Sequence, residues 1–429
     1  MKRPYLLPFV CLLFVTGAAH ALTLEEGLKI VTETGRDTKI ARSDEAVARG
    51  NVSLSRSALY PQVDAYGNQT WLQYQPQAKF SGQTPFTSDK DFLTYGIKAT
   101  QILYDFGKTY SSIDAAKYQL KAKEIETEKA RNRSALDFII AYYDLLEAEK
   151  LAQVAGQDVQ RYEAHKKDAG SRFSAGVVTK NEVLEADVKF ANSRQDYLTA
   201  ENLKSLRASR LNSLLLRPLN DIVQLEEVKT SPSAGITLEE AWATAEAASP
   251  EIRVIDAEIL SKGENVNTAR AEYMPSFFLS GGYQYQENQY QVHQGNWSVI
   301  AGVNINLWSG GATDSKIGMS KGELLSLKLT RDKIIDAVRL DVKSAYLDLQ
   351  SSAQKIDVMK TSVAQAEENL RLQQLRYKEG VGTAIEVLDA VTLLSTVQSN
   401  SWRALYAFER AEAGLLYAMG RDLASTYGK

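Results

Sequence analysis

The sequence predicts a mainly α-helical fold with a few transmembrane β-strands, built from two copies of one structural unit. Residues 22–26 (LTLEE) recur as residues 236–240 (ITLEE). Downstream of this motif in each copy, after Pro61 and Pro275, the apolar pattern alternates with period two, which is typical of a strand with one apolar face. A long proline-free stretch with helical spacing then follows in each copy.

The N-terminus has the features of an export signal. A basic pair, Lys2 and Arg3, precedes an apolar stretch from Tyr5 to Val15, and small residues end the segment. We therefore expect residues 1–21 to be a signal peptide. Cys11 is the only cysteine, so the mature chain can form no disulfide. No later run reaches the roughly 20 apolar residues of a membrane-spanning helix.

Charge and histidine content argue against several function classes. The formal net charge is −3, which gives no reason to expect a nucleic-acid partner. The three histidines, His20, His165 and His293, lie far apart and form no H-x-x-x-H motif. Neither zinc chemistry nor nucleophilic catalysis has a visible constellation. The sequence therefore predicts no enzyme, no metal site and no cofactor.

The two copies can be aligned along their length. Residues 172–177 (RFSAGV) match residues 376–381 (RYKEGV), and 103–107 (LYDFG) fall on 307–311 (LWSGG). A repeat of this size exceeds the usual solenoid periods and indicates a tandem duplication. About ten extra residues of the first copy fall in a predicted loop, where length changes cost little. The expected divisions are a first repeat (22–220), a linker (221–235), a second repeat (236–421) and a C-terminal tail (422–429).

Each repeat is expected to contain one helix followed by a β-hairpin, at residues 62–104 and 276–308. In the second hairpin the apolar positions alternate almost completely: Trp297, Val299, Ala301, Val303, Ile305 and Leu307. A soluble sandwich would show the same alternation. An open sheet in lipid would leave backbone groups unpaired, so a membrane interpretation requires closure by several chains. Three chains would supply twelve strands.

Two long helices are expected after each hairpin. Their predicted ranges are 108–170 and 180–217 in the first copy, and 313–379 and 383–420 in the second. The first range corresponds to roughly 90 Å of helix at 1.5 Å per residue. Because average globular helices have about 11 residues, these helices cannot belong to an ordinary compact domain. We expect them to pack side by side as a rod or tube.

These repeated motifs resemble the outer membrane efflux protein family, the TolC-like channels. The match rests on the duplicated TLEE starts, the strand-initiating Tyr60-Pro61 and Met274-Pro275, the two strand-to-helix corners and the tip sequence 376–383. The resemblance implies a homotrimer with a twelve-stranded barrel in the outer membrane, continuous with a helical tunnel in the periplasm. It also implies a role in efflux or type I secretion, with a periplasmic adaptor, an inner-membrane transporter and outer-membrane lipid as partners.

The turns between the long helices are candidate adaptor-docking segments. Glycines there can end a helix at positive φ, and threonines can cap the next one, so a purely structural role explains them as well. In the resembling family the same tips bind adaptor hairpins. The candidate docking residues are Gly176, Val177, Val178 and Thr179 in the first copy, and Gly380, Val381, Gly382 and Thr383 in the second.

Acidic residues follow both tips. Glu386 and Asp389 lie three positions apart on one helix face, and Glu182 and Glu185 repeat them. Acids at a helix N-terminus also complement the helix dipole. For Glu386 and Asp389 the resemblance instead favours a ring of carboxylates at the periplasmic aperture, which Tyr377 helps to hold shut. For Glu182 and Glu185 a place in the aperture and a purely structural role stay equally open.

The resemblance departs from the family at one position of this entrance. Gly382 stands where well-known relatives carry a basic residue. The salt bridges that close the entrance should therefore differ in this chain.

Two other protein classes share part of this pattern. A periplasmic adaptor has coiled-coil hairpins, but it should also have a lipoyl-like β domain and a membrane or lipid anchor. A passive porin would need many strands per chain and few long helices. An outer-membrane channel subunit fits the predicted elements better than either.

Overall fold

The computed structural model describes residues 21–227 and 235–428. The predicted signal peptide therefore lies outside the described residues except for Ala21, as do residues 228–234 of the predicted linker. Among the helices of the described ranges, none combines the length and the apolar character needed to cross a membrane.

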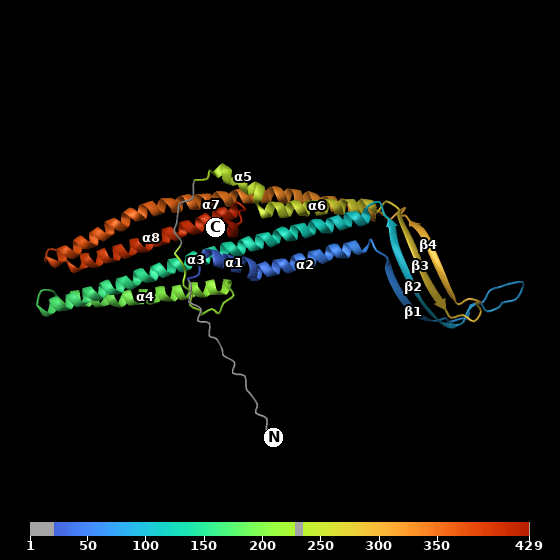
Figure 1. The fold of residues 1–429 in the computed structure, drawn as a ribbon, viewed down its shortest axis with the longest axis horizontal. Coiled ribbons are helices and arrows are strands. Elements are labelled where there is room, and N and C mark those ends of the chain that lie inside the picture. Colours follow the sequence, from blue (N-terminus) through green and yellow to red (C-terminus); the bar gives the residue numbers. More distant parts are fainter. Residues whose placement is uncertain (1–20, 228–234, 429) are drawn as a thin grey trace, which may run out of the picture. The chain divides into compact units, whose positions relative to one another are not determined.

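The two copies have matching elements, and their long helices have the same lengths. Helices α3 and α7 have 67 residues each, and α4 and α8 have 35 each. In chain order (Figure 1) the elements are α1 (Leu24–Thr34), α2 (Arg36–Ser57), β1 (Gln62–Trp71), β2 (Asp91–Tyr104), α3 (Lys108–Ser174), α4 (Lys180–Leu214), α5 (Leu238–Ala248), α6 (Pro250–Ala271), β3 (Ser276–Gln286), β4 (Gly295–Asn304), α7 (Ala312–Lys378), α8 (Ala384–Ala418) and α9 (Leu423–Tyr427).

Each repeat begins with two helices where the sequence analysis expected one. In the first copy α1 ends at Thr34, and Gly35 caps it with a backbone N–H that donates to the carbonyl of Val31. In the second copy Pro250 occupies the first turn of α6, and Ser249 caps that helix by accepting from the backbone N–H of Ile252. Proline is favoured at a helix start because its missing N–H has no partner there anyway.

Two other predicted boundaries differ from the structure. Strand β4 ends at Asn304, so the second hairpin is shorter than the predicted 276–308. The predicted tail contains a short helix, α9, capped by the Asp422 carboxylate, which accepts from the N–H of Ala424. The side chain of Leu423 is fully buried in the helical core, which fixes this segment.

The chain divides into two compact units, and both units use residues from both repeats. Of the described residues, one unit comprises 21–36, 131–227, 235–242 and 341–428. The other comprises Asp37–Ala130 and Ala243–Leu340, and it contains the sheet. The boundaries of the compact units therefore do not coincide with the boundaries of the two repeats.

The four strands form one antiparallel sheet in the order β1-β2-β3-β4. The two copies meet at its centre, where Tyr95 of β2 lies opposite Tyr285 of β3. Their rings stack with centroids 4.9 Å apart. Strands β1 and β4 are the two edges. The two predicted hairpins thus form one continuous sheet within a single chain.

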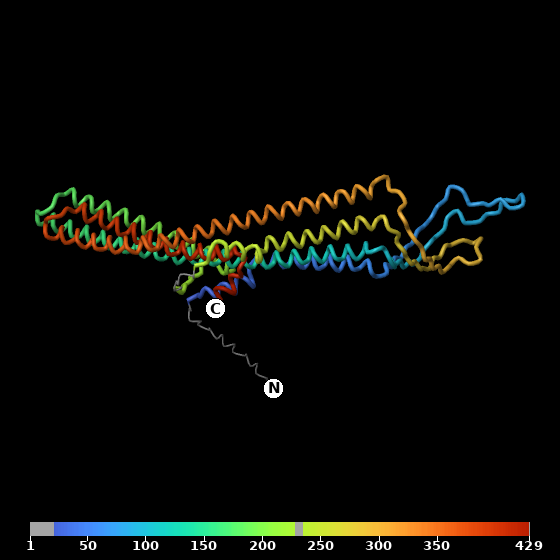
Figure 2. The backbone as a smooth tube through the Cα atoms, turned by 90° about the horizontal axis from the view of Figure 1, so that it is seen from above, coloured from blue at the N-terminus to red at the C-terminus, as the bar shows by residue number. Residues whose placement is uncertain are grey.

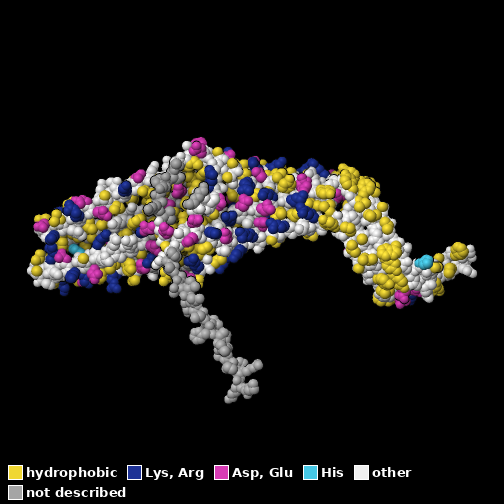
Figure 3. Space-filling view, in the orientation of Figure 1, with side chains coloured by type: hydrophobic (Ala, Val, Ile, Leu, Met, Phe, Trp, Pro, Cys, Tyr) yellow, Lys and Arg dark blue, Asp and Glu magenta, His cyan; other side chains and the backbone are white. Residues whose placement is uncertain are grey.

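The register separates the sheet into an apolar face and a polar face. One row across the sheet contains Ala65, Ile97, Tyr283 and Trp297, and the exposed ring of Trp297 packs on Tyr283 with centroids 5.2 Å apart. Figure 3 shows hydrophobic side chains gathered over the strands, whereas charged side chains are spread over the helices. The next row on the other face contains Asp64, Lys98, Gly282 and Ser298.

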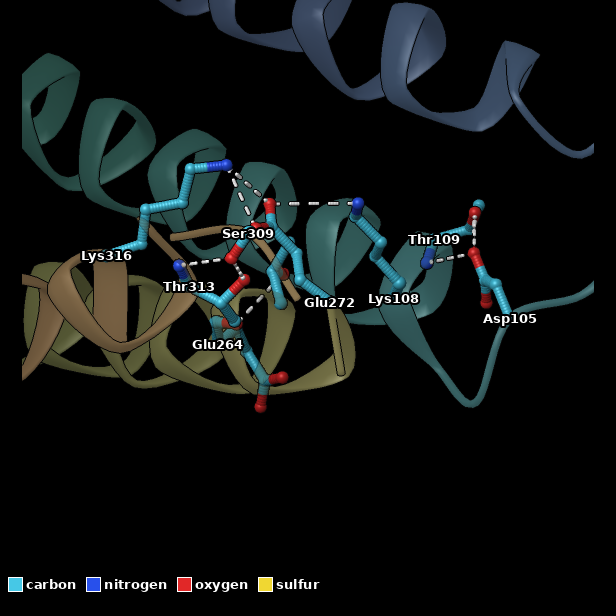
Figure 4. Close-up of polar contacts among 9 residues, drawn as sticks. Asp105, Lys108, Thr109, Glu264, Glu272, Ser309, Thr313 and Lys316 are labelled. Atoms are coloured by element: carbon cyan, nitrogen blue, oxygen red, sulfur yellow. Dashed lines mark hydrogen bonds and ion pairs between the residues drawn. The ribbon is translucent and has the colours of Figure 1, made fainter. Parts of the chain in front are cut away.

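The corners between strand and long helix are built alike in the two copies (Figure 4). The Asp105 carboxylate accepts from the backbone N–H of Thr109 at 2.8 Å. At the equivalent corner the Ser309 hydroxyl accepts from the N–H of Thr313 at 3.3 Å. Both side chains satisfy a donor that the first helical turn leaves unpaired.

A single carboxylate at the end of α6 pairs with the first turns of both long helices. Glu272 accepts from Nζ of Lys316 at 2.9 Å and lies 3.8 Å from Nζ of Lys108 (Figure 4). Lys108 is the first residue of α3 and Lys316 is the fifth residue of α7, so Glu272 links the N-terminal ends of the two duplicated helices.

The unit with the hairpin tips contains two groups of buried apolar residues. The central group joins α1, α3, α4, α8 and α9, and the Tyr142 hydroxyl donates to the carbonyl of Glu226 at 2.7 Å. The second group, the tip cluster, lies where the α3–α4 and α7–α8 hairpins pack together (Figures 1 and 2). The tip cluster consists of Tyr162, Ala366, Leu370, Tyr377, Ala384, Val387, Leu388, Ala390, Val391 and Leu394.

Candidate functional site

Both predicted tips are tight helix-to-helix turns with the same backbone hydrogen bonds. Gly176 and Gly380 have φ of +75° and +79°, which glycine adopts without a Cβ penalty. The N–H of Val177 donates to the carbonyl of Arg172, and the N–H of Val381 donates to that of Arg376. This pattern is a Schellman motif, which satisfies the last carbonyls of a helix.

The exposure of the predicted docking residues is similar in the two tips. Val177 and Val381 are 68% and 70% exposed, respectively. Thr179 and Thr383 are exposed as well, while Val178 is half-buried. Each tip therefore presents an apolar side chain to solvent.

Gly382 occupies a crowded point of its turn. Its N–H donates to the carbonyl of Arg376, and a Cβ added at Gly382 would lie 3.1 Å from Cβ of Arg376 and from N of Tyr377. A larger residue would require the turn to move. The structure thus gives a local reason for glycine at the position where the sequence analysis noted a missing basic residue.

The second-copy tip has a complete capping box. The Thr383 hydroxyl accepts from the N–H of Glu386, and the Glu386 carboxylate accepts from the N–H of Thr383 at 3.0 Å. Asp389, three residues on, is exposed. The two predicted aperture acids therefore differ, because Glu386 also stabilises the start of α8.

The first-copy tip has the same T-x-x-E sequence but no such box. Thr179 makes no side-chain cap, and Oε2 of Glu182 is buried with no hydrogen-bond partner among the described residues. The Glu182 carboxylate is close enough to Tyr377 to raise the pKa of that hydroxyl. Burial lowers the pKa of His165, and Glu185 partly opposes that lowering. These two acids thus influence groups on α7 and α3.

Tyr377 lies in the last turn of α7 and belongs to the tip cluster, with 8% of the side chain exposed. Burial raises the pKa of its hydroxyl, and the nearby Arg172 guanidinium opposes that rise. Its Oη is buried with no hydrogen-bond partner among the described residues. The structure therefore holds Tyr377 by its ring and not by its hydroxyl.

Two residues next to Tyr377 were not among the sequence candidates. The Arg172 guanidinium lies over the Tyr377 ring, 4.6 Å from its centroid. The imidazole of His165 has its centroid 5.7 Å from the same ring. Their spacing of seven residues, two helical turns, was a signal that both share one face of α3. Only the packing of α7 shows which residue that face contacts.

The described residues contain no group of three or more His, Cys, Asp or Glu side chains placed to hold a metal ion.

Comparison with known proteins identifies the family. The outer membrane efflux protein family matches residues 33–215 and 242–421, one range in each copy. Outer membrane efflux protein BepC of Brucella suis is 24% identical over 421 residues, covering 96% of this chain and 88% of BepC. Outer membrane protein TolC of Vibrio cholerae is 22% identical, covering 86% of this chain and 84% of TolC.

A solved structure shows the same fold. The outer membrane protein VceC of Vibrio cholerae superposes with a TM-score of 0.79 at 17% identity, covering 93% of this chain and 96% of VceC. The long helical hairpins and the four-stranded sheet are thus the fold of a known outer-membrane protein. The chain is an outer-membrane protein and belongs to the outer membrane efflux protein family.

Proposed function

We propose that three copies of this chain close a twelve-stranded barrel and form the exit duct of a tripartite efflux or type I secretion system. The observation that carries the proposal is the open sheet, with edge strands β1 and β4 and a face of exposed apolar side chains. Unpaired backbone groups in lipid cost several kcal/mol each, so the edges must pair with other copies. Because each chain supplies four strands, three copies make up the twelve strands that the resemblance implies.

The two faces of the sheet then have different surroundings. The face with Trp297, Val299 and Ile97 contacts outer-membrane lipid. The face with Lys98 and Asp64 lines the water-filled lumen, as alternation requires in a barrel. The passage is non-catalytic and needs no nucleic acid or cofactor.

The hairpin tips dock a periplasmic adaptor, through which the duct meets an inner-membrane transporter. Val177 and Val381 support this role, because each is an exposed apolar side chain at the end of a long helical hairpin. The docking segments are residues 176–179 and 380–383.

The periplasmic entrance lies at the same tips. Asp389 is the acid best exposed to face a passing ion, and Glu386 adds charge while it caps α8. Glu182 and Glu185 act at the entrance through Tyr377 and His165. Three copies of each carboxylate around one axis would favour cations.

Cysteine crosslinking between edge strands tests the assembly. The predicted mature chain has no cysteine, so pairs can be introduced on the lipid-facing side, combining Val63 or Ala65 of β1 with Val299 or Ala301 of β4. A disulfide requires Cα atoms about 4.4–6.8 Å apart, so only the pair in register should react. We expect a band of three chains on non-reducing gels of membrane extracts.

The matched controls are the four single-cysteine variants, which cannot link a ring. A series that stops at two chains, or that extends in a ladder beyond three, would contradict the trimer.

A further inference from the structure

The Tyr377 ring lies between two side chains of α3. The Arg172 guanidinium is 4.6 Å from the ring centroid, within the range of a cation–π contact. The His165 ring is 5.7 Å away, inclined by 47°. Tyr377 belongs to the second copy and its two neighbours to the first, so this contact joins the two hairpins.

Asp168 fixes the orientation of the arginine. Its Oδ2 accepts from Nε of Arg172 at 3.0 Å, one helical turn away. The Cζ atom of the same guanidinium lies over the Tyr377 ring. A guanidinium can stack on an aromatic face, whereas a lysine ammonium has no flat face to offer.

Within the part of the chain that the structure describes, neither the Tyr377 hydroxyl nor Nε2 of His165 has a hydrogen-bond partner. Both atoms are buried. A buried polar group in this state costs about 1–3 kcal/mol. Movement of either group into water would recover that free energy, which lowers the cost of separating the two rings.

Space for such a movement adjoins the contact. An open cavity of about 730 Å³ is bordered by His165, Arg172 and Tyr377. Charged residues at its edge are Arg161 and Asp168 of α3 and Lys378 of α7, while α8 contributes only Val387 and Val391. A protonated imidazole that leaves the ring can therefore be hydrated at once.

The charges around His165 decide the direction of its response to acid. Burial lowers the pKa of His165, and the Arg172 cation lowers it further. Asp168 of α3 and Glu185 of α4 oppose this lowering of the pKa without cancelling it. The state in which the Tyr377 ring is held therefore favours neutral imidazole. As the pH falls below the ordinary histidine pKa of about 6.5, protonation favours the released state over the held one.

We propose that His165 and Arg172 are positioning residues for Tyr377, and that protonation of His165 releases the ring and opens the entrance in acid. The inference rests on the proposed function, because it assumes that Tyr377 belongs to the channel entrance. It assigns a role to a histidine and an arginine that lie outside the predicted ring of carboxylates.

Single-channel recording in planar bilayers between pH 7.5 and pH 5.5 tests the proposal. The wild-type protein should show an open probability about tenfold higher at pH 5.5, since one linked proton can shift an equilibrium up to tenfold per pH unit. His165→Asn and His165→Gln should make the profile flat. Arg172→Gln should give frequent opening at both pH values, and Arg172→Lys should restore closure only in part.

His293→Asn is the matched control. His293 is exposed in the β3–β4 loop and is the other histidine of the described residues. Circular dichroism checks that each variant is folded. Two different substitutions at His165 are used so that the test still stands if one of them folds poorly.

The outcomes separate the two proposals. A wild-type profile that is flat, or that persists in both His165 variants, overturns the role of His165 while leaving the channel intact. No conductance from the wild-type protein at any pH overturns the proposed function, and the present inference with it.

Discussion

The two hairpin tips share the T-x-x-E sequence and the turn of the backbone, and they differ in how the following helix is capped. At the second-copy tip Thr383 and Glu386 bond to each other and complete a capping box. At the first-copy tip Thr179 makes no side-chain cap, and the Glu182 carboxylate instead lies near Tyr377 of the other copy.

This difference shows how a duplicated motif can divide its tasks. A capping box contributes only about 1 kcal/mol, so a change in the surroundings can draw its glutamate away. The second-copy tip keeps its capping box. The first-copy hairpin instead places Glu182, His165 and Arg172 near Tyr377 of the α7–α8 hairpin. Substitutions at equivalent positions should therefore have unequal effects.

Loss of the Tyr377 ring should have the largest effect. Tyr377→Ala removes a buried aromatic side chain, for which typical costs are about 3–5 kcal/mol. We expect amide hydrogen exchange in the last turn of α7 to accelerate by at least about a hundredfold and single-channel conductance to rise. Tyr377→Phe is the matched control, since its ring keeps both contacts and the lost hydroxyl bonds to none of the described residues. Equal effects of the two substitutions would show that the hydroxyl holds the entrance.

Replacing the cap threonines should have an effect of intermediate size, and a larger one at the second-copy tip. Thr383→Ala removes a formed cap and should cost about 1 kcal/mol, which is roughly a fivefold faster exchange of amides in the first turn of α8. Thr179→Ala should change exchange in α4 by much less, because its hydroxyl makes no cap. Similar acceleration at both tips would mean that the first-copy box forms in solution.

The aperture charges should show the smallest effect in free energy. Asp389→Asn and Glu386→Gln each remove three carboxylates from a trimer, and glutamine at this position still completes a capping box. Like charges about 8 Å apart in water repel by about 0.5 kcal/mol, so we expect cation selectivity to fall about twofold with each substitution. The combined Glu386→Ala and Asp389→Ala variant should also raise conductance. Reversal potentials in a salt gradient measure selectivity, and unchanged values would remove Glu386 and Asp389 from the aperture.

Much of the fold follows from periodicity, because period two and helical spacing are properties of the chain itself. The strands and the long helices were predicted on that basis. The short helix α9 was missed because its five residues are stable only through the burial of Leu423. The break before α6 had a signal in Ser249-Pro250 that the prediction did not use.

The candidate site was less predictable than the fold. Gly176 and Gly380 indicated both turns, because positive φ favours glycine. The sequence alone could not show that Glu182 turns from Thr179 towards Tyr377, since that depends on a residue of the other copy. The contact of Arg172 with Tyr377 has the same origin.

The equal length of α3 and α7 has a consequence for how relatives of this protein can vary. One residue inserted into a helix rotates everything beyond it by about 100° and advances it by 1.5 Å. An insertion in α3 alone would move His165 and Arg172 off the face that meets Tyr377. Natural length changes should therefore occur in both helices together, or be confined to loops such as the one between β1 and β2.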